Sequence, residues 1–190
     1  MRGDAIMRVI SGYLKGRNLE GYMVETTRPT MDRVKESMFA SIQNDIDSSL
    51  ILDLFCGTGS LGIEAISMGA KKCYFVDNNK NIINYLNKNI SNLNIRDKSV
   101  VVEKDYKEAL LYLKNNGIKF NIILVDAPYK MEVMEEIIKL VCKYELLLDN
   151  GLLVLEYSFD KLEDNYDNLK LIKYKKYGEK FVSIYRKVID

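Results

Sequence analysis

The sequence lacks histidine entirely and holds only three cysteines, Cys56, Cys73 and Cys142, which lie far apart and form no C-x-x-C pair. These shortages remove the usual zinc ligand sets, so we expect no metal site. They also exclude nucleophilic machinery of the Ser-His-Asp and Cys-His types. Any chemistry must therefore depend on carboxylates, tyrosines, backbone groups and a bound cofactor.

Long apolar runs are also missing. No stretch approaches the roughly 20 apolar residues that a membrane-spanning helix needs, and the first ten residues lack the apolar core of a secretory signal. We therefore expect a cytoplasmic protein, most simply a monomer. The formal charge of +1 gives no global argument for binding a polyanion, so any such argument must be local.

From Leu50 onward, short apolar runs alternate with segments of helical periodicity, a pattern typical of parallel strands covered by helices on both faces. The predicted strands are residues 50–55, 72–76, 99–103, 121–125 and 151–156, and the predicted helices are residues 60–68, 79–92, 106–114 and 131–147. A stripe of Met134, Ile137, Ile138 and Val141 marks the buried face of the last helix.

The alternation changes after the fifth strand. Residues 169–177 and 180–187 are strand-like and have only Gly178 and Glu179 between them, which predicts an antiparallel hairpin. A dehydrogenase-type sheet would instead end in a parallel strand that follows a helix. We therefore predict an α/β, Rossmann-like class I methyltransferase fold with a seven-stranded, mostly parallel sheet and helices on both faces.

The N-terminal part differs from the rest. Residues 7–19, with glycines at positions 12 and 16, predict a small hairpin, and Thr30 is a plausible N-cap for the helix that follows. A chain of 190 residues can bury one substantial core. We therefore expect an N-terminal hairpin appendage over residues 1–29 and one catalytic domain over residues 30–190.

The segment from Asp53 to Gly62, D-L-F-C-G-T-G-S-L-G, runs from a predicted strand into a predicted helix and contains G-x-G-x-x-G. Glycines let this loop turn sharply and let its backbone approach a ligand. Asp53 lies four residues before the first glycine, where a loop that binds pyrophosphate has no use for negative charge. A ligand that carries a positively charged ammonium group would instead be stabilised by a carboxylate at this position. Cys56 is interpreted as a packing residue.

Two further acids follow the next strands. Asp77 ends the second strand, where a carboxylate can accept hydrogen bonds from both ribose hydroxyls of an adenosine. Asp105 follows the third and could accept from an adenine amino group. Each acid alone could equally be a helix N-cap, but together they fit one S-adenosylmethionine molecule. The residues predicted to bind it are Asp53, Phe55, Gly57, Thr58, Gly59, Gly62, Asp77, Asn78, Asp105 and Tyr106.

The fourth predicted strand ends in Asp126-Ala127-Pro128-Tyr129, which we predict to be the catalytic segment. The amine of a nucleobase is a poor nucleophile, so catalysis needs acceptors aimed at its two N–H protons. The Asp126 carboxylate and the Ala127 carbonyl can supply them, and Pro128 keeps Ala127 extended. Tyr129 can stack on an unstacked base. The alternative is an ordinary turn after a buried strand.

These motifs resemble those of the amino-group methyltransferases of nucleic acids. The N-terminal blocks M-R-V-I-S-G at residue 7, K-G-R at 15, T-R-P-T at 27 and D-R-V-K-E at 32 more closely resemble the bacterial 16S rRNA guanine-N2 methyltransferases. The resemblance implies methyl transfer from S-adenosylmethionine to the N2 of a guanine in small-subunit rRNA. One departure is Ala127, where that family usually has the first proline of D-P-P-Y.

The N-terminal blocks are rich in cations that can bind RNA phosphates. We predict RNA contacts for Arg8, Lys15, Arg17, Arg28, Arg33 and Lys35. A solvated basic surface is the alternative. The lysines of the closing hairpin could extend the RNA surface or protect a sheet edge.

Three other functions stay open. The motif D-A-P-Y recognises an amino group and not a particular ring, so another RNA base or a DNA adenine could be the acceptor. A nicotinamide-dependent oxidoreductase could use the same glycine loop. A non-catalytic RNA-binding protein could keep the fold.

Overall fold

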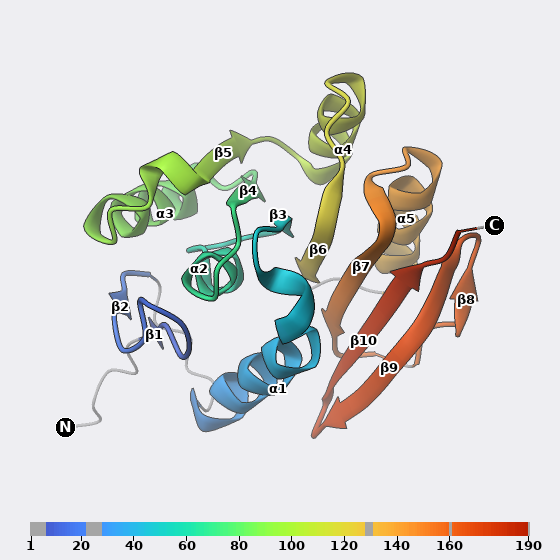
Figure 1. The fold of residues 1–190 in the computed structure, drawn as a ribbon, viewed down its shortest axis with the longest axis horizontal. Coiled ribbons are helices and arrows are strands. Elements are labelled where there is room, and N and C mark those ends of the chain that lie inside the picture. Colours follow the sequence, from blue (N-terminus) through green and yellow to red (C-terminus); the bar gives the residue numbers. More distant parts are fainter. Residues whose placement is uncertain (1–6, 22–27, 128–130, 160, 190) are drawn as a thin grey trace.

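The computed structural model describes residues 7–21, 28–127, 131–159 and 161–189, with the side chains of residues 28–31 and of residue 131 left out of that description. Within these ranges an eight-stranded sheet forms the centre of the molecule, in the order β5-β4-β3-β6-β7-β10-β9-β8 (Figure 1). Among the described residues, none of the helices combines the length and the apolar character that a membrane span requires.

Five neighbouring strands of this sheet are parallel. They are β3 (Leu50–Leu54), β4 (Lys72–Asp77), β5 (Ser99–Glu103), β6 (Phe120–Asp126) and β7 (Leu147–Tyr157). The predicted closing hairpin is confirmed, because β9 (Leu169–Tyr177) pairs antiparallel with β10 (Lys180–Lys187). β10 also pairs antiparallel with β7. The predicted count of seven strands is one short, because the two-residue strand β8 (Asn165–Tyr166) extends the edge beyond β9.

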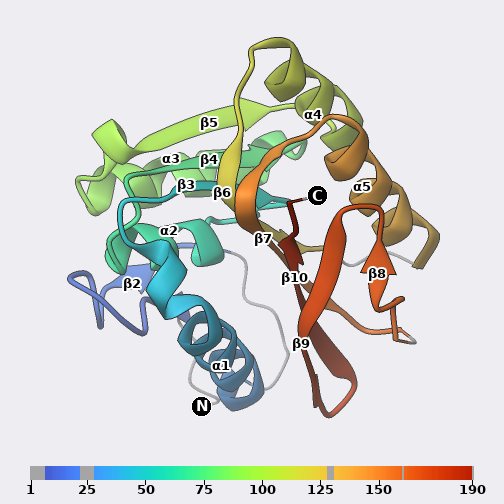
Figure 2. The same ribbon diagram turned by 45° about the vertical axis from the view of Figure 1, so that its right-hand side comes forward.

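Helices cover both faces of the sheet, as predicted (Figure 2). On one face lie α1 (Arg28–Ile46), α2 (Ser60–Ser67) and α3 (Lys80–Asn92), and on the other lie α4 (Tyr106–Asn115) and α5 (Met131–Lys143). The strands alternate between the two cores. In β6, Ile122 and Leu124 pack with the first set of helices, whereas Ile123 and Val125 pack with the second. The predicted buried stripe of α5 is confirmed.

Two predicted helix boundaries were wrong. The helix predicted over residues 131–147 ends at Lys143, because Glu145 adopts a positive φ of 50° and β7 begins at Leu147. The helix predicted to follow an N-cap at Thr30 begins earlier, at Arg28. A short 3₁₀ helix, η1 (Arg96–Lys98), precedes β5.

The predicted N-terminal hairpin is present as β1 (Met7–Arg8) and β2 (Asn18–Leu19). It packs on α2 and α3: the backbone N–H of Leu14 donates to Ser67 Oγ, and that of Glu20 donates to Asn89 Oδ1. Val9, Leu14 and Leu19 are buried in the same apolar core as α1. The division into an appendage and a catalytic domain stays a prediction.

Candidate active site

The loop between β3 and α2 turns through backbone conformations that favour glycine. Gly57 has φ of 55° and Gly59 has φ of 90°. A Cβ built on Gly57 would meet open space, whereas one built on Gly62 would lie 2.3 Å from the Phe75 ring. Gly57 therefore leaves room for a ligand beside the backbone, and Gly62 lets α2 pack closely on β4. Thr58 is half-buried, and its carbonyl accepts a hydrogen bond from Asn89 Nδ2 at 3.0 Å.

Asp53 is the most buried acid of the site, with 1% of its surface exposed. The backbone N–H of Gly62 donates to Asp53 Oδ2 at 2.8 Å, so this carboxylate caps the first turn of α2. Burial raises the pKa of Asp53 to about 7, and the negative charges of Asp126 and Asp77 act in the same direction against the Gly62 hydrogen bond. Asp53, at the end of β3 that leads into the loop, is therefore a carboxylate whose negative charge is only partly stabilised by its surroundings, and a cationic ligand would stabilise it further.

Asp77 connects the second strand to the glycine loop. Its Oδ2 accepts a hydrogen bond from the backbone N–H of Gly57 at 3.0 Å, and its Oδ1 accepts one from that of Asn79 at 2.9 Å. A carboxylate oxygen can accept more than one hydrogen bond. Asp77 can therefore hold the loop and still accept from ligand hydroxyls. Asn78, next to it, is exposed.

Asp105 and Tyr106 begin α4. Asp105 is the N-cap, and its side chain accepts from the backbone N–H of Lys107. The Tyr106 hydroxyl donates to Glu136 at 2.7 Å, and the Tyr106 ring lies 5.5 Å from that of Phe55, centroid to centroid. The structure thus accounts for Asp105 as a helix cap, and its contact with adenine stays a prediction. The aromatic pair flanks the loop that carries Gly57.

Asp126 is the last residue of β6 and is half-buried, and Ala127 follows it in the interior at 4% exposure. The pKa of Asp126 is raised to about 6, mainly by burial and further by the negative charge of Glu156, with Lys180 opposing both. Pro128 and Tyr129, the other two predicted catalytic residues, lie outside the described residues.

Two residues of this edge were missed by the sequence reasoning. Glu156, near the end of β7, lies opposite Asp126 in the sheet and is 7% exposed. Lys180, at the start of β10, donates to Glu156 Oε1 and forms an ion pair with it. A signal was present: Glu156 is an acid near the end of the apolar run of β7, just as Asp53, Asp77 and Asp126 lie at or near the ends of theirs.

The acids of these strand ends share one electrostatic environment. Asp126 and Asp77 both raise the pKa of Asp53, although the three residues come from three different strands. A molecule with an ammonium group and hydroxyl groups matches such a carboxylate set, and the space beside Gly57 gives it access. The residues present therefore fit S-adenosylmethionine. Among the described residues, no cluster of side chains suited to a metal ion is found.

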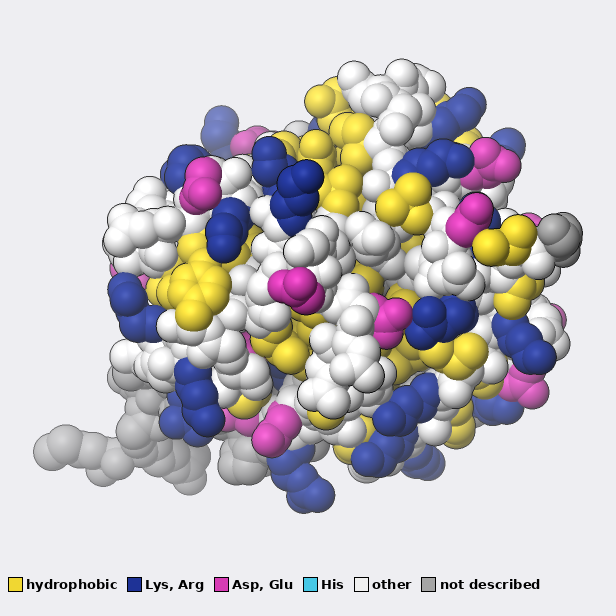
Figure 3. Space-filling model, in the orientation of Figure 1, with side chains coloured by type: hydrophobic (Ala, Val, Ile, Leu, Met, Phe, Trp, Pro, Cys, Tyr) yellow, Lys and Arg dark blue, Asp and Glu magenta, His cyan; other side chains and the backbone are white. Residues whose placement is uncertain are grey.

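The structure describes the side chains of five of the six predicted RNA-binding cations. Arg8, Lys15, Arg17 and Arg33 are exposed, and Lys and Arg side chains lie over several parts of the face seen in Figure 3. The Arg28 side chain lies outside the described residues.

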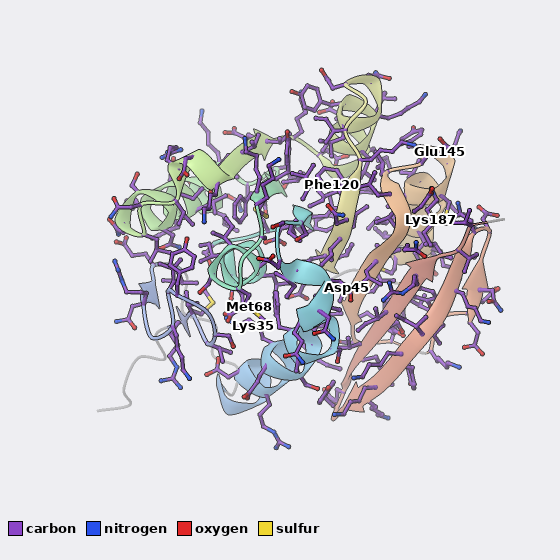
Figure 4. The ribbon with its side chains drawn as sticks, viewed as in Figure 1. Lys35, Asp45, Met68, Phe120, Glu145 and Lys187 are labelled. Atoms are coloured by element: carbon purple, nitrogen blue, oxygen red, sulfur yellow. The ribbon has the colours of Figure 1, made fainter. Side chains whose placement is uncertain are left out.

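Lys35 is a correction to this set. It is 7% exposed and points from α1 toward α2 (Figure 4). There its ammonium group lies 3.1 Å from Glu64 Oε2, and it donates to Ser60 Oγ and to the Arg8 carbonyl. An ammonium group engaged in this way is unavailable to RNA. Lys35 instead joins α1, α2 and the N-terminal hairpin.

Comparisons with known proteins place the chain in a family. The model of the family described as conserved hypothetical protein 95 matches residues 7–186. The Bacillus subtilis protein YlbH is 36% identical over 182 residues, which are 95% of this chain and 99% of that protein. The ribosomal RNA small subunit methyltransferase D of Haemophilus influenzae is 35% identical, over 90% of this chain and 89% of that protein. The solved structure of Escherichia coli yhhF superposes with a TM-score of 0.85 at 29% identity, covering 98% of this chain and all of that one.

These matches confirm the predicted fold and the predicted class of S-adenosylmethionine-dependent methyltransferases. The chain belongs to the conserved hypothetical protein 95 family, which it shares with ribosomal RNA small subunit methyltransferase D.

Proposed function

We propose that this protein transfers a methyl group from S-adenosylmethionine to the exocyclic N2 of a guanine in small-subunit ribosomal RNA. The observation that carries the proposal is the position of Asp126: a half-buried carboxylate at the carboxyl end of β6, the strand that pairs with β3, which carries Asp53 beside the glycine loop. The family relationship with an rRNA methyltransferase supports the choice of substrate.

The cofactor-binding residues follow from the site. Asp53 and Asp77 would hold the ammonium group and the ribose hydroxyls, and Gly57 would give the backbone access to the ligand. Phe55 and Tyr106 would flank the adenine. The bound cofactor supplies a methyl group that its sulfonium already activates, so the protein needs to position the acceptor more than to provide a strong base.

Asp126 and Ala127 act on the acceptor amine. The lone pair of guanine N2 is conjugated with the ring. A carboxylate oxygen and a carbonyl oxygen that accept the two N–H groups favour the pyramidal nitrogen that can attack. A carboxylate with a pKa of about 6 is mostly ionised at neutral pH, so Asp126 accepts hydrogen bonds there and can take the released proton.

The test is methylation of defined acceptors. The protein is incubated with labelled S-adenosylmethionine and with small-subunit particles lacking the modification, naked rRNA from those particles, or duplex DNA. The modified base is then identified by mass spectrometry. We expect N2-methylguanine in rRNA. Methylation of DNA alone, or of another RNA base, would contradict the proposal.

A variant links the reaction to the site. We expect Asp126→Asn to lower the rate of methyl transfer by about 10²- to 10³-fold, as removal of one aligned polar group does in other enzymes, with little change in S-adenosylhomocysteine affinity. Asp149→Asn, the same substitution near the opposite end of the strands, is the control and should leave both unchanged. Full turnover by Asp126→Asn would remove Asp126 from the mechanism.

A further inference from the structure

Asp126 can recognise an amino group, but it cannot distinguish guanine from another base that carries one. The bases differ along the Watson–Crick edge. Guanine presents two donors and then an acceptor: the N2 amine, the N1–H and O6. 2,6-Diaminopurine keeps the N2 amine but presents an acceptor at N1 and a donor at position 6. A guanine-specific enzyme therefore needs an acceptor and a donor beside the group that holds N2.

The carboxyl edge of the sheet carries such a series. Asp126 on β6, Glu156 on β7 and Lys180 on β10 come from three strands that are neighbours in that order. Their side chains point to one face of the sheet, because the residues two positions along each strand, Leu124, Val154 and Val182, pack in the same core. Asp126 and Glu156 are paired in register, and Lys180 contacts Glu156.

The chemical order of the side chains matches that of the base. Read across the sheet from β6, the groups are a carboxylate acceptor, a second carboxylate acceptor and an ammonium donor. Read from N2, guanine offers donor, donor and acceptor. Lys180 keeps 35% of its side chain exposed, and an ammonium group has three N–H donors, so its bond to Glu156 leaves donors for O6.

Resting on the proposed function, we infer that Glu156 and Lys180 recognise the target guanine, the Glu156 carboxylate accepting from N1–H and the Lys180 ammonium donating to O6. A purely structural ion pair explains the arrangement less well. Glu156 places negative charge beside Asp126, and a buried pair is often replaced by apolar residues without loss of stability. A bound guanine would explain both charges, because its N1–H can donate to the Glu156 carboxylate and its O6 can accept from the Lys180 ammonium group.

The experiment uses a fragment of small-subunit rRNA that the wild-type protein methylates, made with guanine or with 2,6-diaminopurine at the modified position. The measured quantity is the ratio of the two kcat/KM values. We expect the wild-type protein to prefer guanine by at least about tenfold, the discrimination typical of a paired polar contact to a base edge.

Two variants test the two contacts. Glu156→Gln should bring the ratio to about one or invert it, because the amide nitrogen can donate to the N1 of diaminopurine. Lys180→Met should lower the ratio as well, because it removes the donor to O6. Any effect of Glu156→Gln on the ionisation of Asp126 acts on both substrates equally and cancels in the ratio. Lys187→Met, at the other end of β10 beside Asp149, is the matched control and should keep the wild-type ratio.

The outcomes separate this inference from the proposed function. If the wild-type protein methylates no guanine in rRNA, the proposed function fails. If it does methylate guanine, but both variants keep the wild-type ratio of the two kcat/KM values, the assignment of Glu156 and Lys180 is wrong. The proposed function then still stands. S-Adenosylhomocysteine affinity is measured for each variant, and a variant that no longer binds it is taken to have lost its fold. The ratio measured for the other variant then tests the inference.

Discussion

On one side of the sheet, two regions hold acids whose negative charges are stabilised to very different degrees. Glu64 of α2 accepts from the backbone N–H groups of Ile10 and Ser11 and pairs with Lys35 at 3.1 Å. Asp53 and Asp126 instead lie near other acids, and the pKa of each is raised by burial and by those acids, with Lys180 only partly opposing the shift of Asp126. Glu64 is therefore a structural acid with its own partners, whereas the charged forms of Asp53 and Asp126 cost stability and indicate a site for a ligand.

The largest effect should come from Glu64. Glu64→Gln leaves the Lys35 charge buried without its partner, so we expect the free energy of unfolding to fall by about 3–5 kcal/mol, measured by urea denaturation. Glu145→Gln breaks the exposed pair with Lys119 and is the control, with an expected change below about 0.5 kcal/mol. Equal effects of the two variants would remove the contrast between buried and exposed pairs.

In contrast with Glu64, we expect substitution of Asp53 to weaken ligand binding without lowering the free energy of unfolding. Asp53→Asn keeps an oxygen that can accept from Gly62 but loses the charge, so we expect S-adenosylhomocysteine to bind roughly 10- to 100-fold more weakly, or about 1.4–2.8 kcal/mol. The free energy of unfolding at pH 8 should not decrease. Calorimetry and urea denaturation measure the two quantities. Unchanged affinity would mean that Asp53 is only a helix cap.

The pH dependence of the free energy of unfolding tests whether the pKa of Asp53 is raised in the folded protein. A carboxyl group whose pKa rises from 3.8 when unfolded to about 7 when folded binds its proton more tightly in the native state. Its contribution to the free energy of unfolding therefore falls as pH rises from about 4 to about 7. We expect the wild-type protein to lose at least about 1 kcal/mol more than Asp53→Asn between pH 5 and pH 8. Parallel curves for the two proteins would contradict the raised pKa.

The smallest expected effect concerns the pH profile of the reaction. Because Asp126 must be ionised to accept the amine protons, kcat should fall as pH is lowered through about 6. Glu156→Gln removes one of the charges that raise this pKa, so the midpoint should move to lower pH by less than about one unit. Burial, the larger cause, remains. An unchanged midpoint would show that Glu156 does not influence Asp126.

Much of this arrangement could be predicted from local patterns. The strand runs, the glycine loop and the hairpin at Gly178 depend on residues close in sequence, and acids at strand ends must meet at one edge of a parallel sheet. The partners of those acids could not be predicted. The pairing of Glu156 with Lys180 depends on how β10 inserts beside β7. Lys35 looked like an exposed cation because the sequence does not show that α1 turns it toward Glu64.

The position of β10 has a consequence for biosynthesis. This strand comes after every other element of the sheet in the described chain, yet it lies between β7 and β9. Until β10 has been synthesised, the side of β7 that faces away from β6 is an unpaired edge. Because β7 has an apolar run, this edge could pair with the wrong strand or with another chain. Insertion of β10 closes that edge and delivers Lys180 in the same step. We therefore expect the free edge of β7 to persist until β10 inserts, and the groups proposed to recognise the base to come together in the same step.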